Sequence, residues 1–281
     1  VSGSNAQMLS RELSSALRGW PLEYEEFPLS FNEFCRFKNI KTNGFTEIDR
    51  IRLKNAFMEF NHSSAFPEVV LIPEKSMKDR KLQGYFNTML FRDLIEHYQL
   101  NNPEVVRYFL KRVMANLSKP TSINSIFNDL KSQGLKVGKD KLYELAEHCC
   151  SIFLFFRVPK YDRSMIKENS SLPKYYCIDN GIRNAVLLPQ SDDDGKLLEN
   201  TVFLALRRVL KPCDKILYFQ GTKECDFVVQ QNDQIVHLIQ VTWDMRDKET
   251  RKREIDGIVE ASRVTGCDSL IILTNNEEGE I

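Results

Sequence analysis

The chain has 281 residues, of which 42% are hydrophobic and 28% are charged. A chain of this length can form roughly two or three domains, each able to bury its own core. Lys plus Arg and Asp plus Glu number 39 each, so the formal net charge is zero, and this balance argues against a protein that coats nucleic acid through a global positive field.

The sequence also argues against membrane and zinc proteins. It contains no apolar run approaching the roughly 20 residues of a membrane helix and no visible signal peptide, so we expect a cytoplasmic protein without a membrane partner. Its seven cysteines form no Cys-x-x-Cys pair, which favours reduced thiols. None of the four histidines has the spacing of a zinc ligand set.

No phosphate-binding loop of the form G-x-x-x-x-G-K-[ST] occurs in the chain. Residues 134–140 read Gly-Leu-Lys-Val-Gly-Lys-Asp, with one residue too few between the glycines and with Asp140 where Ser or Thr would hold magnesium. Gly134 is more simply a glycine that ends a helix before a turn. We therefore expect no ATP hydrolysis by this chain.

The middle of the chain has the pattern of a winged helix. Apolar residues recur at helical spacing over 104–117 and 122–133, and a third helix is predicted to begin at Asp140 or Lys141. Residues 153–158 and 174–178 are expected to pair as the wing. The charges of the third helix are mixed, which favours a structural or protein-contact module over a DNA reader. Residues 160–171 are polar and irregular and are expected to form a mobile loop.

The last hundred residues alternate between helical and strand patterns. A helix is predicted over 196–210 and a second one over 246–265. Three strands lie between them, at 216–219, 225–229 and 235–243, and a buried strand follows at 269–274. The predicted order is therefore αβββαβ. Because strand side chains alternate between faces, Gln240 and Thr242 share one face, and a hairpin can bring Asp226 beside them.

This order resembles the PD-(D/E)xK, restriction-endonuclease-like fold. In active members an acidic residue of the first helix, an Asp and a second Glu or Gln hold a divalent metal, and a Lys two residues later activates water. The resemblance implies catalytic positions at Glu199, Asp226, Gln240 and Thr242, with Glu199 and Asp226 as metal ligands. Thr242 stands at the lysine position. We therefore expect a degenerate, inactive site, unless Lys223, Lys248 or Lys252 supplies the ammonium.

Short segments ahead of this block carry a second resemblance. They are Val1–Asn5, Ala16–Gly19, Phe27–Phe34, Ala65–Leu71, Phe91–Ile95 and Pro173–Gly181. In their order they resemble the end of the ATPase module, and the region after it, in a family of prokaryotic AAA+ type ATPases that carry a C-terminal domain of unknown function. The resemblance implies that Ser4 and Asn5 are the polar sensor residues beside the γ-phosphate. Trp20 replaces the second arginine of the family's L-R-G-R segment, which puts a phosphate-sensing role there in doubt.

Together these patterns predict a multidomain α/β and α+β protein. Residues 1–75 would be the remnant of an AAA+ module with its helical lid, 76–188 a winged-helix-like domain and 189–281 the restriction-endonuclease-like domain. The natural protein is expected to begin earlier and to bind ATP and Mg²⁺ only when intact, whereas this chain alone is expected to bind neither.

For function, the sequence favours the C-terminal half of such an ATPase, with a nuclease-like domain that binds an unknown protein partner or nucleic acid without cutting. An active Mg²⁺-dependent nuclease and a winged-helix DNA-binding regulator are the alternatives. Basic residues at Arg251, Lys252 and Arg253 are candidate phosphate contacts, or else a solvated helix face. Whether the protein is an enzyme, and whether it forms oligomers, is left open.

Overall fold

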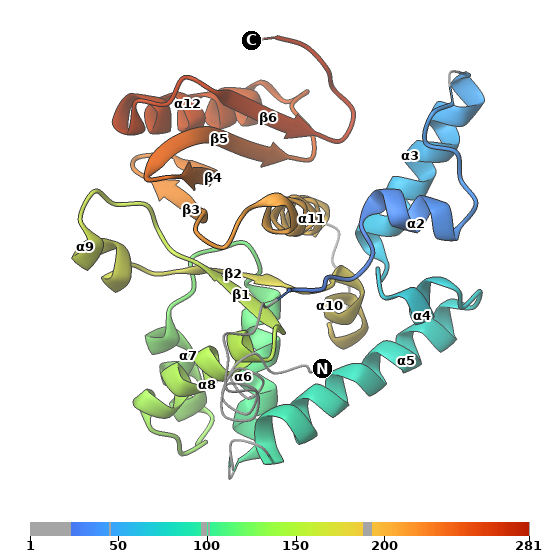
Figure 1. The fold of residues 1–281 in the computed structure, drawn as a ribbon. Helices are drawn as coiled ribbons and strands as arrows, with labels where there is room; N and C mark the ends of the chain where they lie inside the picture. The colour runs from blue at the N-terminus through green and yellow to red at the C-terminus, as the bar shows by residue number, and fades with distance from the viewer. Residues whose placement is uncertain (1–23, 45, 97–99, 101, 188–192, 281) are drawn as a thin grey trace, which may run out of the picture. The chain divides into compact units, whose positions relative to one another are not determined.

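The computed structural model describes residues 24–44, 46–96, 100, 102–187 and 193–280 (Figure 1). The described chain divides into two compact units. Unit 2 comprises Leu117–Thr121, Arg157–Tyr176 and the residues from Asp193 onward, and unit 1 comprises the rest. Ser4 and Asn5 lie outside the described residues, as does the predicted domain boundary at 188–189.

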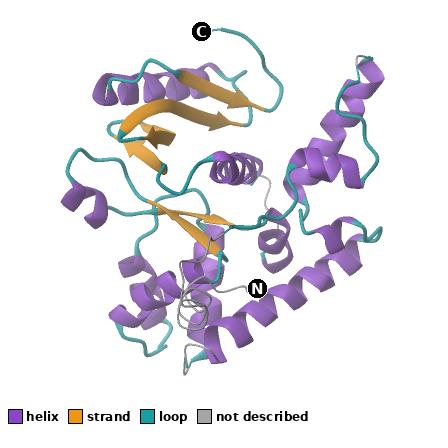
Figure 2. Ribbon diagram, viewed as in Figure 1, coloured by secondary structure: helices purple, strands orange, loops and turns teal. Residues whose placement is uncertain are grey.

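Unit 1 is built mainly of helices (Figure 2). They are α2 (Phe31–Phe37), α3 (Glu47–His62), α4 (Pro67–Val70), α5 (Lys75–Thr88), the π-helical segment η1 (Met89–Glu96), α6 (Pro103–Ala115), α7 (Ile123–Ser132), α8 (Lys139–Ser151) and α10 (Asn180–Val186). Capping boxes begin α2, at Ser30 and Glu33, and α3, at Thr46 and Asp49. Among the described residues, no helix is both long and apolar enough to cross a bilayer.

The three helices predicted in the middle of the chain are confirmed as α6, α7 and α8. Asn102 caps α6 and Ser122 caps α7, each by accepting a hydrogen bond from a backbone N–H of the first turn. Gly134 has φ +76 just beyond the end of α7, as expected of a glycine that ends a helix. Strands β1 (Phe155–Val158) and β2 (Lys174–Cys177) pair in a two-stranded sheet. The winged-helix assignment itself stays a prediction.

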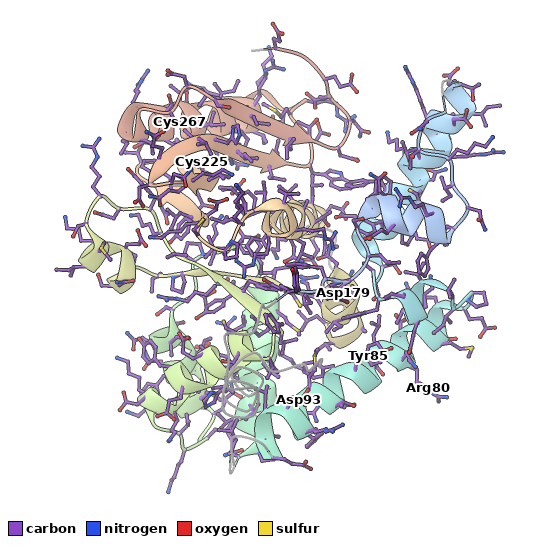
Figure 3. All side chains as sticks on the ribbon, viewed as in Figure 1. Arg80, Tyr85, Asp93, Asp179, Cys225 and Cys267 are labelled. Atoms are coloured by element: carbon purple, nitrogen blue, oxygen red, sulfur yellow. The ribbon has the colours of Figure 1, made fainter. Side chains whose placement is uncertain are left out.

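Asp179, at the start of α10, is the centre of a buried hydrogen-bonded cluster within unit 1, here called the polar node (Figure 3). Its carboxylate accepts hydrogen bonds from the backbone N–H groups of Ala65, at 2.7 Å, and Ile182, at 2.9 Å, and from the Ser64 hydroxyl at 3.2 Å. Gly181 lies so close to Ser64 that a Cβ there would come within 2.6 Å of the Ser64 backbone nitrogen. The node joins the segment before α4 to the start of α10.

Unit 2 contains a four-stranded sheet in the order β3-β4-β5-β6, and its elements follow the predicted αβββαβ order. The bounds are α11 (Asp194–Val209), β3 (Lys215–Gln220), β4 (Glu224–Gln231), β5 (Gln234–Thr242), α12 (Lys248–Thr265) and β6 (Leu270–Thr274). Strands β3, β4 and β5 are antiparallel neighbours, and β6 runs parallel to β5. The connection from β5 to β6 through α12 is thus a β-α-β unit, which parallel neighbours require.

The core of unit 2 has an aliphatic part and an aromatic part. Ile258 and Ala261 of α12 pack on Leu217, Val228 and Leu238 of the sheet, together with Cys225 and Cys267 (Figure 3). The aromatic part joins Phe203 of α11 to Phe227 of β4 and Tyr176 of β2, with the Tyr176 and Phe203 rings stacked at 4.4 Å between centroids. The aromatic part places α11 and β4 close to β2.

Residues 157–176, here called the strap, correct one prediction. The sequence predicted an irregular mobile loop over 160–171, but residues 165–170 form the short helix α9 (Met165–Ser170). The Tyr161 N–H donates to the Tyr218 carbonyl at 2.7 Å, and the Tyr218 N–H donates to the Pro159 carbonyl at 3.1 Å. The strap is therefore hydrogen-bonded to β3 at Tyr218 as part of unit 2, and the strands at its two ends, β1 and β2, pair as predicted.

Candidate functional site

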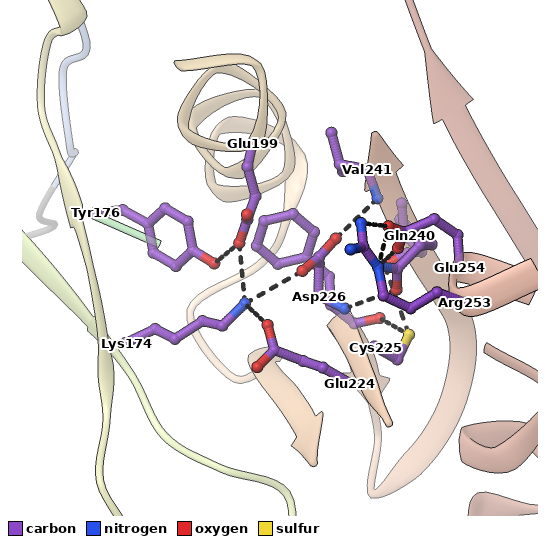
Figure 4. Close-up of polar contacts among 12 residues, drawn as sticks. Lys174, Tyr176, Glu199, Glu224, Cys225, Asp226, Gln240, Val241, Arg253 and Glu254 are labelled. Carbon is purple, nitrogen blue, oxygen red and sulfur yellow. Dashed lines mark hydrogen bonds and ion pairs between the residues drawn. The ribbon is translucent and has the colours of Figure 1, made fainter. Parts of the chain in front are cut away.

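An ammonium group lies among the acidic side chains of unit 2. Lys174 Nζ is 3.0 Å from Glu199 Oε1, 3.2 Å from Asp226 Oδ1 and 2.6 Å from Glu224 Oε1 (Figure 4). The Lys174 side chain has no solvent exposure, whereas that of Glu224 is 33% exposed. We call Lys174, Tyr176, Glu199, Glu224 and Asp226 the Lys174 network.

The backbone around Lys174 is fixed from a neighbouring segment. The Ser118 N–H donates to the Tyr175 carbonyl at 3.2 Å, and the Thr121 N–H donates to the Pro173 carbonyl at 2.8 Å. Pro120 and Lys174 form an isolated antiparallel bridge. The Lys174 ammonium also lies 5.4 Å from the centre of the Tyr218 ring, a cation–π distance. These contacts direct the side chain towards α11 and β4.

Tyr176 and Lys174 converge on the same carboxylate oxygen. The Tyr176 hydroxyl donates to Glu199 Oε1 at 2.6 Å, and Lys174 donates to that oxygen as well. The two residues are separated by one position along β2, so they lie on one side of the strand. Glu199 projects from α11, and the stacking of Tyr176 on Phe203, one turn further along this helix, keeps the hydroxyl in place.

The pKa values of Lys174 and Glu199 are shifted by two opposing effects, burial and the charges of neighbouring side chains. Burial by itself lowers the pKa of Lys174, but the acidic groups around it, Glu199 first, outweigh that effect and hold the pKa well above its usual value. Lys174 is therefore charged. Burial, and after it the nearby Asp226 carboxylate, raise the pKa of Glu199 to about 8, although Lys174 and Tyr176 act in the opposite direction.

The strand register places Asp226 beside Gln240, as predicted. Phe227 pairs with Ile239, the Val241 N–H donates to Asp226 Oδ2 at 2.9 Å, and the Asp226 N–H donates to Gln240 Oε1 at 3.2 Å. The Gln240 amide nitrogen donates to Glu254 of α12, and Glu254 also accepts from the Arg253 guanidinium. Because both ends of the Gln240 amide are engaged in this way, its oxygen is turned to the backbone and not to the acidic side chains.

Among the described residues, the Thr242 hydroxyl is bonded outside the Lys174 network. It donates to the Asp244 carbonyl at 3.4 Å, a long hydrogen bond. The ammonium that Thr242 cannot supply comes from Lys174. The sequence predicted that no lysine reaches Glu199 and Asp226, unless Lys223, Lys248 or Lys252 does. Both alternatives are wrong, because the lysine at these carboxyl groups is Lys174.

Sequence reasoning missed Lys174, Tyr176 and Glu224 as members of the site. Lys174 precedes Glu199 by 25 positions and Asp226 by 52, so no local pattern connects them. A signal for Glu224 was present, since it lies two positions before Asp226 on the same strand and so on the same side. Lys174 and Tyr176 belonged to a recognised segment, but nothing in that segment indicated where it folds.

The residues as arranged do not fit a magnesium ion. Magnesium requires near-octahedral oxygen ligands at about 2.0–2.1 Å. Between Glu199 and Asp226 the space is taken by the Lys174 ammonium, and the Gln240 oxygen is bonded to a backbone N–H. Throughout the described residues, no group of three or more His, Cys, Asp or Glu side chains is arranged to hold a metal ion.

The basic residues at the start of α12 differ in their contacts: Arg253 is bonded to an acidic side chain, whereas Arg251 and Lys252 are exposed. Arg253 is hydrogen-bonded to Glu254, whose other oxygen accepts from Gln240, so its guanidinium is tied to the edge of the site (Figure 4). Arg251 and Lys252 are exposed on the first turns of α12. Their role in binding phosphate stays a prediction.

Residues 57–193 match the family model described as Domain of unknown function (DUF8612). The match includes the strap, and with it Lys174 and Tyr176, but ends before Glu199. No solved structure matches the chain at a significant level.

Two similar proteins come from distant organisms. An uncharacterized protein of Methanocaldococcus jannaschii is 31% identical over 285 residues, which cover 99% of this chain and 63% of that protein. An uncharacterized protein of Haemophilus influenzae is 26% identical over 248 residues, which cover 87% of this chain and 59% of that protein. The chain thus spans less than two thirds of the length of either relative.

Proposed function

We propose that this chain is the C-terminal part of a cytoplasmic AAA+ type ATPase, and that its nuclease-like unit binds a protein partner or nucleic acid without cutting. ATP and Mg²⁺ are ligands of the intact protein only, at the ATPase module where Ser4 and Asn5 would be sensor residues. The ordered segments that resemble this ATPase family support the proposal. So does the greater length of the two relatives, which leaves room for a nucleotide-binding module.

One observation carries the proposal of a unit that does not cut. The charge between Glu199 and Asp226 is a fully buried lysine ammonium held at 3.0 and 3.2 Å. Metal-dependent hydrolysis needs a divalent cation in that space, because the cation lowers the pKa of a bound water and so generates the nucleophile. An ammonium balances negative charge but has no open coordination position for water. The carboxylates are therefore retained as part of a stabilising ionic network.

A cleavage assay tests this proposal. Supercoiled plasmid and single-stranded DNA and RNA are incubated with the chain in Mg²⁺ or Mn²⁺, beside an Asp226→Ala variant and a chelator control. We expect no cleavage that depends on Asp226. The ATPase part is tested separately, because a longer natural form should hydrolyse ATP whereas this chain should not.

A Mg²⁺-dependent nuclease is the second candidate, and one observation favours it. The ammonium that the PD-(D/E)xK pattern requires is present within hydrogen-bonding distance of both carboxylates, although it comes from Lys174 and not from position 242. In this case Lys174 would move aside to orient water while Glu199, Asp226 and Gln240 turned to a metal. DNA degradation that is abolished by chelator, by Asp226→Ala and by Lys174→Met would establish this candidate and overturn the first.

A further inference from the structure

The strap is attached to the rest of unit 2 mainly at its two ends. At the first end, Pro159 and Tyr161 exchange backbone hydrogen bonds with Tyr218. At the second end, the Tyr218 hydroxyl donates to the Leu172 carbonyl at 2.6 Å, and Lys174 and Tyr176 enter the acidic network. Tyr218 of β3 thus contacts both ends of the strap.

The middle of the strap is sparsely packed. Helix α9 contains no buried residue, and its Met165 and Ile166 side chains are 73% and 80% exposed. Within the described residues, this part contacts the rest of unit 2 through a hydrogen bond from Arg163 to the Val264 carbonyl and a long ion pair, 3.9 Å, between Glu168 and Lys215. Segments with few buried contacts open locally at a lower free energy than the core around them.

The second end of the strap is held by charge as well as by the packing of Tyr176 on Phe203 and by backbone hydrogen bonds from Ser118 and Thr121. The helix and strand that receive it contribute the carboxyl groups of Glu199, Glu224 and Asp226, and the strap contributes the Lys174 ammonium. Without the ammonium, these acidic groups would face one another in a mostly buried space, which is costly. Lys174 is therefore the side chain on which closure of the strap depends most.

We propose that the strap is a releasable latch, closed by Lys174, which must open before any cation or phosphodiester can approach Glu199 and Asp226. This inference rests on the proposed function, a nuclease-like unit that does not cut, and explains why Glu199 and Asp226 do not reach a substrate. Opening removes Tyr176 from the aromatic part of the core but leaves the aliphatic packing of α12 on the four-stranded sheet, because the strap meets that part at its edge, through the partly buried Tyr161. The latch thus makes access to the acidic side chains a conformational step separate from unfolding.

Hydrogen exchange read by mass spectrometry tests the latch. The amides of Tyr161, Ser118 and Thr121 report on it, because each is a donor in a hydrogen bond to or from the strap. In a Lys174→Met variant we expect these amides to exchange roughly tenfold faster or more, while β4 and β5 keep their wild-type rates. Lys167→Met is the matched control, since it removes an exposed lysine from the same strap, and it should change neither set.

A second measurement needs no variant and so holds even if Lys174→Met does not fold. In the wild-type chain at increasing low urea, the strap amides should open at a lower free energy than the amides of β4 and β5. If both sets open together, or if the strap in folded Lys174→Met stays as protected as in wild type, the latch is wrong. Asp226-dependent cleavage by the wild-type chain would instead contradict the proposed function, and the hydrogen-exchange result for the strap would remain valid.

Discussion

At the residue scale, Lys174 has the most demanding position in unit 2. A fully buried ammonium is tolerated only where its charge is answered, and here three carboxyl groups lie within hydrogen-bonding or ion-pair distance. Removing one member of a buried ionic group costs more than the group contributes as a whole, since the remaining charges stay buried without a partner. The network is therefore a point at which unit 2 is sensitive to substitution.

We predict that Lys174→Met lowers the free energy of unfolding by roughly 3–5 kcal/mol, although methionine nearly matches the length of the lysine stem. Urea unfolding followed by circular dichroism measures the loss. The control Lys167→Met should stay within about 0.5 kcal/mol of wild type, as exposed substitutions do. A Lys174→Met loss as small as the control's would mean that the ammonium is not bound as described.

Asp179 of unit 1 carries the pH prediction. Burial raises the pKa of Asp179 to about 6, although the backbone N–H groups of Ala65 and Ile182 act against the rise. Because the folded pKa lies above the unfolded value, this group favours folding most at low pH. That contribution is lost as the pH rises from about 4 through about 6, a change of about 3 kcal/mol.

The measurement compares unfolding free energies of wild type and Asp179→Asn at pH 4.5 and 7. The variant loses an acceptor of the Ala65 and Ser64 hydrogen bonds at both pH values, so only the difference between the two pH values tests the titration. Wild type should lose more stability than the variant on going from pH 4.5 to 7. Equal pH dependence would show that Asp179 does not titrate in this range.

At the element scale, the local patterns of unit 2 were predictable and the strap was not. The four strands and both helices begin and end within two residues of the predictions, because apolar periodicity and turn residues are local signals. The prediction that the last strand is buried is wrong, since Leu270, Ile271 and Leu273 of β6 are exposed. The polar residues between Lys160 and Ser171 carry no such signal. Their place follows from hydrogen bonds to Tyr218 and from a charge network whose members are up to 52 positions apart.

The packing of α12 on β4 gives a prediction about two glycines. A Cβ at Gly257 would lie 2.2 Å from the Glu224 carbonyl oxygen, whereas a Cβ at Gly84, inside α5, meets nothing within 4 Å. Gly257→Ala should therefore destabilise the protein by roughly 1–3 kcal/mol, since α12 must shift away from β4. Gly84→Ala should stabilise it by roughly 0.5–1 kcal/mol through helix propensity.

Thermal unfolding of the two variants provides the comparison. The same substitution on two helices should move the midpoint in opposite directions, which separates backbone crowding from helix propensity. If Gly257→Ala is neutral or stabilising, α12 does not approach β4 as closely as described. Because Glu224 belongs to the Lys174 network, Gly257→Ala should also weaken protection of the strap.

At the scale of the whole molecule, two compact units share a chain that passes between them more than once. Unit 2 takes Leu117–Thr121 and the strap from within the sequence of unit 1, and both segments position Lys174. The sequence predicted consecutive domains. Lys174 precedes the αβββαβ block in the chain, so it was assigned to the winged-helix-like domain over 76–188. The partner carboxylates Glu199 and Asp226 were found because the motif places both within that block.

The position of the Lys174 ammonium also predicts whether the stability of unit 2 depends on a divalent cation. A unit whose buried acidic side chains are already paired with an ammonium does not depend on a divalent cation to fold. We therefore expect its stability to be the same in chelator and in millimolar Mg²⁺.

Titration calorimetry of Mn²⁺ into the folded chain tests whether the Lys174 ammonium, and not a metal ion, occupies the space between Glu199 and Asp226. With Lys174 between Glu199 and Asp226, we predict heats of dilution only, the same for wild type, for Asp226→Asn and for the exposed control Glu249→Gln. A one-to-one binding isotherm in wild type and in Glu249→Gln that Asp226→Asn abolishes would contradict the account, because it would show that a metal displaces the ammonium.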